Sequence, residues 1–254
     1  MFRILRNVAA VISAALLLPT GTVFPAEGAH WSYSGHTGPA QWGSMEEDFK
    51  TCAAGKLQSP IDIRNDTAKK TDLPALRFDY KPSVLKIVDN GHTIQVNYDH
   101  GSVLTAGDKQ YELLQFHFHK PSEEKLNGKS YPMVTHLVHR AKDGKLGVVA
   151  VLLSNGHGNP LIETLWDHLP KKKETETVVD AVKINAVDLV PKNQAYYTFA
   201  GSLTTPPCSE GVTWFVLKDS TSVSREQVAR FGKLYPMNAR PVQPLNGREV
   251  KVSH

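Results

Sequence analysis

The sequence predicts a single domain that is mainly β, an α+β fold with one antiparallel-rich sheet and few helices. Short segments that are β-branched, or that alternate between apolar and polar residues, recur from residue 61 onward. Turn signals such as Asn90-Gly91 separate neighbouring segments. We find no internal repeat, linker or second domain boundary beyond the N-terminal segment, so one domain accounts for the rest of the chain.

The N-terminus has the pattern of a secretory signal peptide. A basic start with two arginines precedes the apolar run Val8–Leu18, which is too short to span a bilayer, and small residues follow. We therefore expect residues 1–28 to be a signal peptide, with cleavage between residues 26 and 29, and residues 29–254 to form the mature domain. An uncleaved membrane anchor is the alternative. The expected location is exported, either periplasmic or secreted.

The composition is that of an ordinary soluble globular protein, with 41% hydrophobic and 21% charged residues and a formal net charge of +4. The single basic run, Lys171–Lys173, stands beside two glutamates and is interpreted as a solvated face. We expect no nucleic-acid partner and, after cleavage of the signal peptide, no membrane partner. A homodimer is left open.

The first part of the mature chain predicts a lobe with little regular structure, apart from a short helix at Met45–Phe49. The continuous apolar run Leu146–Leu153 predicts a central strand buried on both faces. Other strands are predicted at Leu76–Tyr80, Val84–Val88, Thr93–Tyr98, Gln115–His119, His136–His139 and Val212–Leu217. Helices are predicted at Leu161–Leu169, after Pro160, and at Ser224–Phe231, with Ser222 or Ser224 near its cap.

The segment Gln115–His119 carries the chemistry. Its period-two alternation places His117 and His119 on one face of a strand, about 6.6–7 Å apart at the backbone, so both imidazoles can converge on one cation. A turn signal separates this segment from His136, which we expect to lie opposite the pair on an antiparallel neighbour. Three imidazoles leave one tetrahedral position open, as in a catalytic zinc site. The alternative is that the close pair is a coincidence of strand composition.

His139 faces the other way from His136 under strict alternation. We interpret it as a buried structural histidine rather than as a fourth ligand.

Several separate blocks of the chain, in order, resemble the α-class carbonic anhydrases of the bacterial exported type. That family is itself the reference case for the open three-histidine zinc site. The blocks are His30–Tyr33, Gly38-Pro39, Gln58–Ile63, Asn90–His92, Gln115–His119, His136–His139, Ser202–Cys208 and Arg240–Leu245.

The resemblance implies a large twisted, mostly antiparallel central sheet of about ten strands with few peripheral helices. It implies a lyase that reversibly hydrates carbon dioxide to bicarbonate and a proton by attack of zinc-bound hydroxide. The cofactor would be Zn²⁺ held by His117, His119 and His136, and His92 would be the proton shuttle. Esterase activity could accompany this reaction, because the same hydroxide attacks activated carbonyls.

The remaining site residues are also implied by the resemblance. Thr204 would receive a hydrogen bond from the hydroxide and donate one to the buried Glu123. Gln115 and the backbone carbonyl of Asn238 would accept hydrogen bonds from His117 and His119. Thr205 would contact bicarbonate. The apolar substrate pocket would consist of Val138, Val148, Leu203, Val212 and Trp214, and the ordered waters would be held by Tyr33, Asn90 and Gln95.

The chain has only two cysteines, Cys52 and Cys208. In an exported chain they are expected to form one disulfide, and the resemblance agrees. Metal ligation by these cysteines is the weaker alternative, because they lack the close spacing of a metal-binding pair.

One position departs from the family. Where the family has a glutamate that accepts a hydrogen bond from the third histidine, this chain has Val134, which cannot accept one. We expect zinc still to bind, with a water or another acceptor in place of that glutamate. Glu124, just after the buried acid, is a second, smaller departure. Two alternatives stay open: a catalytically weak or silent zinc-binding module, which the departure at Val134 favours slightly, and a zinc hydrolase or zinc store, which would share the same metal site.

Overall fold

The computed structural model describes residues 30–254. The predicted signal peptide at 1–28 and its cleavage region lie outside the described residues. Within residues 30–254, none of the helices has both the length and the apolar character that a membrane-spanning helix needs.

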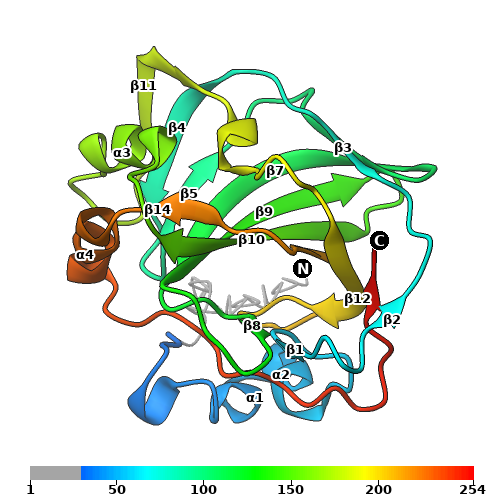
Figure 1. The fold of residues 1–254 in the computed structure, drawn as a ribbon. Coiled ribbons are helices and arrows are strands. Elements are labelled where there is room, and N and C mark those ends of the chain that lie inside the picture. The colour runs from blue at the N-terminus through cyan, green and yellow to red at the C-terminus, as the bar shows by residue number, and fades with distance from the viewer. Residues whose placement is uncertain (1–29) are drawn as a thin grey trace, which may run out of the picture.

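One mixed sheet of 13 strands organises the described part of the chain (Figure 1). Ten of them lie side by side in the order β11-β4-β5-β7-β9-β10-β13-β12-β15-β2, and β3, β6 and β14 pair beside this path. Most neighbouring pairs are antiparallel; β10 with β13, β10 with β14, and β15 with β2 are parallel. The helices are few and lie at the margins of the sheet. The predicted mainly β fold with a mostly antiparallel sheet is therefore confirmed.

The long strands are β4 (Ser83–Asp89), β7 (Lys109–His119), β9 (Met133–Ala141), β10 (Leu146–Asn155), β11 (Thr177–Ile184), β12 (Tyr196–Ser202) and β13 (Glu210–Leu217). The short ones are β1 (Asp62–Ile63), β2 (Lys69–Lys70), β3 (Leu76–Asp79), β5 (Ile94–Asn97), β6 (Val103–Ala106), β8 (Lys125–Leu126), β14 (Thr221–Val223) and β15 (Lys251–Val252). The helices are η1 (Gly35–Thr37), α1 (Trp42–Met45), η2 (Glu47–Phe49), α2 (Thr51–Ala54), α3 (Pro160–Asp167), η3 (Ala186–Leu189) and α4 (Arg225–Leu234).

The predicted strands are present as β3, β4, β5, β7, β9, β10 and β13, and β10 is buried on both faces as expected. Both predicted helices begin at side-chain caps. Asn159 accepts a hydrogen bond from the Ile162 N–H at the start of α3. Ser224 and Gln227 form a capping box at the start of α4.

The short helix predicted at Met45–Phe49 is present only in part, as the 3₁₀ helix η2, which α1 and α2 flank along the chain. Glu46 has an extended backbone (φ −142°, ψ 157°), which separates α1 from η2. Pieces this short have little helical stability of their own. They are ordered instead by packing, chiefly through Trp42, which is fully buried against the disulfide.

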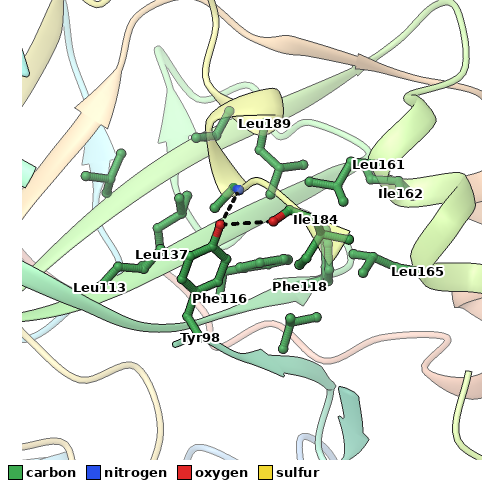
Figure 2. Packing of buried hydrophobic residues seen from close by; sticks show 14 of the residues in the cluster. Tyr98, Leu113, Phe116, Phe118, Leu137, Leu161, Ile162, Leu165, Ile184 and Leu189 are labelled. Carbon is green, nitrogen blue, oxygen red and sulfur yellow. Dashed lines mark hydrogen bonds between the residues drawn. The ribbon is translucent and has the colours of Figure 1, made fainter. Parts of the chain in front are cut away.

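The larger hydrophobic core covers one face of the central strands. Figure 2 shows Phe116 and Phe118 of β7 packed with Leu137 of β9 and with Leu161 and Leu165 of α3. These phenylalanines alternate along β7 with His117 and His119, so the histidines must face away from this core. The strand that carries the histidines is therefore anchored on its opposite face.

The tyrosine in Figure 2 ties the edge of this core to a loop. The Tyr98 hydroxyl accepts the Ala186 N–H at 3.0 Å, and its proton lies near two carbonyl oxygens, that of Lys81 at 2.8 Å and that of Ile184 at 3.3 Å. A buried hydroxyl with both partners satisfied costs little and fixes the neighbouring backbone.

Cys52 and Cys208 form a disulfide, as predicted. It joins α2 to the segment that follows Thr204 and Thr205, across a sequence separation of 156.

Candidate metal centre

The register between β7 and β9 brings the three predicted histidines together. His117 lies directly opposite His136, and His119 lies two residues further along the same face of β7. The ring centroids are 5.0 Å apart for His117 and His119, 5.4 Å for His117 and His136, and 4.7 Å for His119 and His136. One nitrogen from each ring lies within 4.8 Å of the other two. Among the described residues, this is the group of histidine, cysteine and acidic side chains that could hold a metal ion.

The outer nitrogen of each ring contacts an oxygen that acts as an acceptor. His117 Nδ1 lies 2.8 Å from Gln115 Oε1, and His119 Nδ1 lies 2.7 Å from the Asn238 carbonyl oxygen. His136 Nε2 lies 3.0 Å from Glu124 Oε1. Because a carbonyl or carboxylate oxygen only accepts, each outer nitrogen carries the proton and donates. The inner nitrogens of the neutral rings are then left with their lone pairs, which is the form that binds a metal ion.

Burial reinforces this protonation pattern at two of the rings. It lowers the pKa of His117 to about 3, although part of that ring faces the cavity, and it lowers the pKa of His119 well below the usual value. Both rings are thus neutral near pH 7. For His136, burial alone would lower the pKa. The carboxylates of Glu124 and Glu123 outweigh burial, so the pKa of His136 is raised overall. The neighbouring acids therefore favour positive charge at the centre of the cluster.

Glu123 lies beside the inner nitrogens. Its Oε2 is 3.5 Å from His119 Nε2 and 3.8 Å from His136 Nδ1, and its Oε1 accepts the Arg240 N–H at 2.7 Å. Burial raises the pKa of Glu123 to about 7, whereas His136, the Arg240 N–H and the Thr204 hydroxyl act in the opposite direction. Thr204 is buried beside this carboxyl, although only the Arg240 contact has full hydrogen-bond geometry.

Two buried atoms that have no hydrogen-bond partner among the described residues indicate that this site suits a bound cation. His119 Nε2 is buried and has no hydrogen-bond partner within the described part of the chain, and neither does Glu123 Oε2 beside it. An unpaired buried nitrogen is costly unless something binds its lone pair. Three inward imidazole nitrogens form a donor set suited to zinc.

The comparisons with known proteins decide the family. A sequence profile described as eukaryotic-type carbonic anhydrase matches residues 37–254. The chain is 43% identical over 246 residues to a carbonic anhydrase of Neisseria gonorrhoeae. The aligned region covers 93% of this chain and 94% of that protein. It is 42% identical over 228 residues to a carbonic anhydrase of Nostoc sp., and that aligned region covers 89% of this chain and 86% of the Nostoc protein. The chain belongs to the α-class carbonic anhydrase family.

A solved structure gives the same result. The α-carbonic anhydrase of Thermovibrio ammonificans, solved in complex with the inhibitor sulfanilamide, matches with a TM-score of 0.85 at 43% identity. The match covers 88% of this chain and 99% of that one. The protein is accordingly an enzyme of the carbonic anhydrase class, a lyase.

In this family member, the other predicted polar residues line one cavity of about 130 Å³ with His117 and His119. They are Tyr33, Asn90, His92, Gln95, Gln115 and Thr205. Thr204 is buried next to Glu123 instead.

His92 is half-buried in the turn after Asn90, two residues before the start of β5. Its ring stacks on Trp31, with centroids 3.6 Å apart and planes 6° apart. Burial, followed by the nearby His30, lowers the pKa of His92. The Asn90 side chain accepts the backbone N–H of His92 at 3.0 Å, which holds the turn.

The predicted apolar pocket residues belong to the smaller hydrophobic cluster. Val148, Val212 and Trp214 are buried, and Val138 and Leu203 pack against them. The Trp214 ring lies 4.9 Å from the His136 ring, edge to face. This cluster therefore reaches the metal centre as an apolar wall.

Several neighbours of the site do not emerge as site residues from the sequence, among them Thr93 in the cavity wall, Arg240 beside Glu123, and the two discussed next, Glu124 and Trp31. Glu124 supplies the acceptor that Val134 lacks, although from the sequence it is only a small departure from the family pattern. The only signal for it is a second acid directly after Glu123. Trp31 stacks on His92, but nothing in the sequence around it predicts that contact.

Proposed function

We propose that this chain reversibly hydrates carbon dioxide to bicarbonate and a proton, with Zn²⁺ as its cofactor. The observation that carries the proposal is the convergence of three inward imidazole nitrogens, one of them buried without a partner, beside a cavity. His117 and His119 would hold the ion through Nε2 and His136 through Nδ1. When bound, zinc lowers the pKa of a water to about 7, a value known from carbonic anhydrases themselves, so hydroxide is available near neutral pH.

Thr204 and Glu123 orient the attacking oxygen. A Thr204 hydroxyl that donates to Glu123 presents only its lone pairs to the cavity, so it accepts a hydrogen bond from the attacking oxygen. The oxygen lone pair is thereby turned toward the substrate. Glu123 is held for this role by the Arg240 N–H.

Carbon dioxide is small and apolar, so it is expected to bind a dry surface. The wall that contains Val148, Val212 and Trp214 supplies that surface beside His136. Thr205 lines the cavity, where its side chain can contact the bicarbonate product. Water is displaced from this wall at little cost because no polar group there needs solvation.

His92 carries the released proton away. It lines the same cavity as His117 and His119, and its imidazole exchanges protons near neutral pH. Tyr33, Asn90 and Gln95 line the same cavity and would order the connecting waters; the Asn90 side chain donates to Gln95 at 3.2 Å.

We also place this enzyme outside the cytoplasm, in the periplasm or beyond it. The disulfide supports an oxidising compartment, and the N-terminal pattern supports export. A fractionated host that carries the full chain would test this location. Recovery of the enzyme with cytosolic markers only would contradict it.

The catalytic proposal is tested by metal analysis together with stopped-flow hydration of carbon dioxide. Purified protein should contain one zinc per chain, lose activity on treatment with a chelator, and regain it when zinc is added. His119→Ala should abolish hydration, and His100→Ala, which removes an exposed histidine in the turn between β5 and β6, should not. Zinc-loaded protein without hydration activity would instead support the silent binding module.

A further inference from the structure

Two buried acids follow one another between β7 and β8, and both face the ring of His136. Glu123 Oε2 lies 3.8 Å from Nδ1, on the inner side of the ring. Glu124 approaches the outer side, with Oε1 at 3.0 Å and Oε2 at 3.2 Å from Nε2. Glu124 is fully buried, and within residues 30–254 its carboxylate has no other hydrogen-bond partner. Both of its oxygens are therefore directed at one nitrogen.

The backbone of Glu124 is held on both sides. Its carbonyl oxygen accepts the Ser122 hydroxyl at 2.8 Å, and that hydroxyl accepts the Tyr131 N–H at 2.9 Å. The next residue, Lys125, begins β8 and pairs with Asp62 of β1. The carboxylate is thus delivered by a fixed segment, which favours a defined orientation of its partner ring.

Val134 closes the other approach to His136. It lies two residues earlier on the same face of β9, opposite His119, and is fully buried in the apolar cluster with Ile61 and Leu152. Valine offers no acceptor. Without Glu124, the Nε2–H of His136 would be buried and unpaired, and neither the tautomer nor the ring orientation would be fixed.

We propose that Glu124 is the positioning residue of His136: it holds the proton on Nε2, directs Nδ1 to the centre of the cluster, and so slows the loss of zinc. A glutamate at residue 134 would reach the same nitrogen from the strand, so the two positions are alternatives. The inference rests on the proposed function only in taking Zn²⁺ as the bound ion.

The test measures zinc release from the loaded protein in excess chelator, without reference to activity. Glu124→Ala should release zinc roughly 10–100-fold faster, the range known for such outer partners, partly from carbonic anhydrases themselves. Glu124→Gln keeps a neutral acceptor and should show a smaller acceleration. The double variant Glu124→Ala with Val134→Glu should return toward the wild-type rate. Glu47→Gln, a surface glutamate, is the matched control.

A second measurement needs no zinc. In metal-free protein at alkaline pH, where the His136 ring is neutral, ¹⁵N NMR of the histidine rings should show the Nε2–H form of His136 in the wild type and a mixture of tautomers in Glu124→Ala. If the alanine variant fails to fold, Glu124→Gln and the double variant carry the same comparison.

Three outcomes would overturn the proposal. They are a folded Glu124→Ala protein with the wild-type release rate, an unchanged His136 tautomer in that variant, and a double variant that releases zinc as fast as Glu124→Ala alone. Zinc-loaded wild type that does not hydrate carbon dioxide would refute the proposed function while leaving this inference standing.

Discussion

The side-chain amide of Asn238 donates to the backbone oxygen of His92 at 3.0 Å. The same amide donates to the Phe118 carbonyl oxygen, and its own oxygen accepts the Lys120 N–H at 2.7 Å. The backbone carbonyl of Asn238 accepts from His119. One fully buried asparagine therefore joins the turn that carries His92 to the end of the strand that carries His119.

Asn238→Ala should weaken the whole domain. The substitution keeps the backbone contact to His119 but leaves the Lys120 N–H and the His92 oxygen without this partner. We expect a loss of roughly 2–4 kcal/mol in the free energy of unfolding, measured by chemical denaturation. Asn193→Ala, at an exposed asparagine with one local bond, should change it by less than about 1 kcal/mol. Equal stabilities for the two variants would contradict this account.

His92→Ala should slow proton release and leave carbon dioxide attack intact. We expect kcat in dilute buffer to fall roughly 10–100-fold while kcat/KM changes little, because the proton leaves after the hydration step. Added imidazole buffer should restore much of the lost kcat. His100→Ala is the control, since it removes an exposed histidine in the turn between β5 and β6. A fall in kcat/KM without rescue by buffer would point to a structural role for His92.

Replacing both cysteines by serine should destabilise the fold. Closing a loop across 156 residues contributes at most about 5 kcal/mol by restricting the unfolded chain. The actual loss should be smaller, because residual structure in the denatured chain already restricts this loop. Dithiothreitol should lower the Tm of the wild type and leave the double variant unaffected. If dithiothreitol lowered the Tm of both proteins equally, the stabilising role of the Cys52–Cys208 disulfide would be refuted.

His139 should make the stability depend on pH. Its Nδ1 donates to the Gly147 carbonyl at 3.2 Å and its Nε2 accepts the Tyr80 hydroxyl at 2.6 Å, and burial lowers its pKa to about 4. The unfolded chain, with a histidine pKa near 6.5, binds the proton first as pH falls. Stability is therefore fully present above about pH 6.5 and is lost toward pH 4, by roughly 3 kcal/mol from this residue.

The measurement is the free energy of unfolding of wild type and His139→Gln at several pH values between 7 and 4. Glutamine does not ionise, so the advantage of the wild type should shrink as pH falls through this window. His100→Gln, at an exposed site, should keep the wild-type pH dependence. Parallel curves for wild type and His139→Gln would exclude a buried neutral imidazole at this position.

Local sequence patterns predict the strand that carries the site because β geometry is local. The alternation of Phe116 and Phe118 with His117 and His119 fixes which side chains enter the core, and the turn before β9 fixes what lies opposite. Caps such as Ser224 mark a helix start for the same reason. The helix predicted at Met45–Phe49 is broken into short pieces, because its segment is ordered by burial of Trp42 rather than by its own propensity.

The hydrogen-bond partners around the histidines come from positions that are distant in the sequence. Glu124 reaches His136 across 12 residues, and Arg240 reaches Glu123 across 117. No periodicity joins such positions, and the Asn238 contact follows from the family resemblance alone. Loop packing decides these partners, because an acceptor works only where the folded backbone sets it within about 3 Å of a nitrogen.

The amino-acid sequence by itself therefore determined the β fold, the shared face of His117 and His119, and the approach of His136, since each depends on the period of a strand and one hairpin. Only the tertiary structure decided that an acid on the neighbouring loop takes the place that Val134 leaves without an acceptor. A burial pattern specifies which side of the sheet a residue occupies, but the polar partner it meets there depends on how distant segments pack.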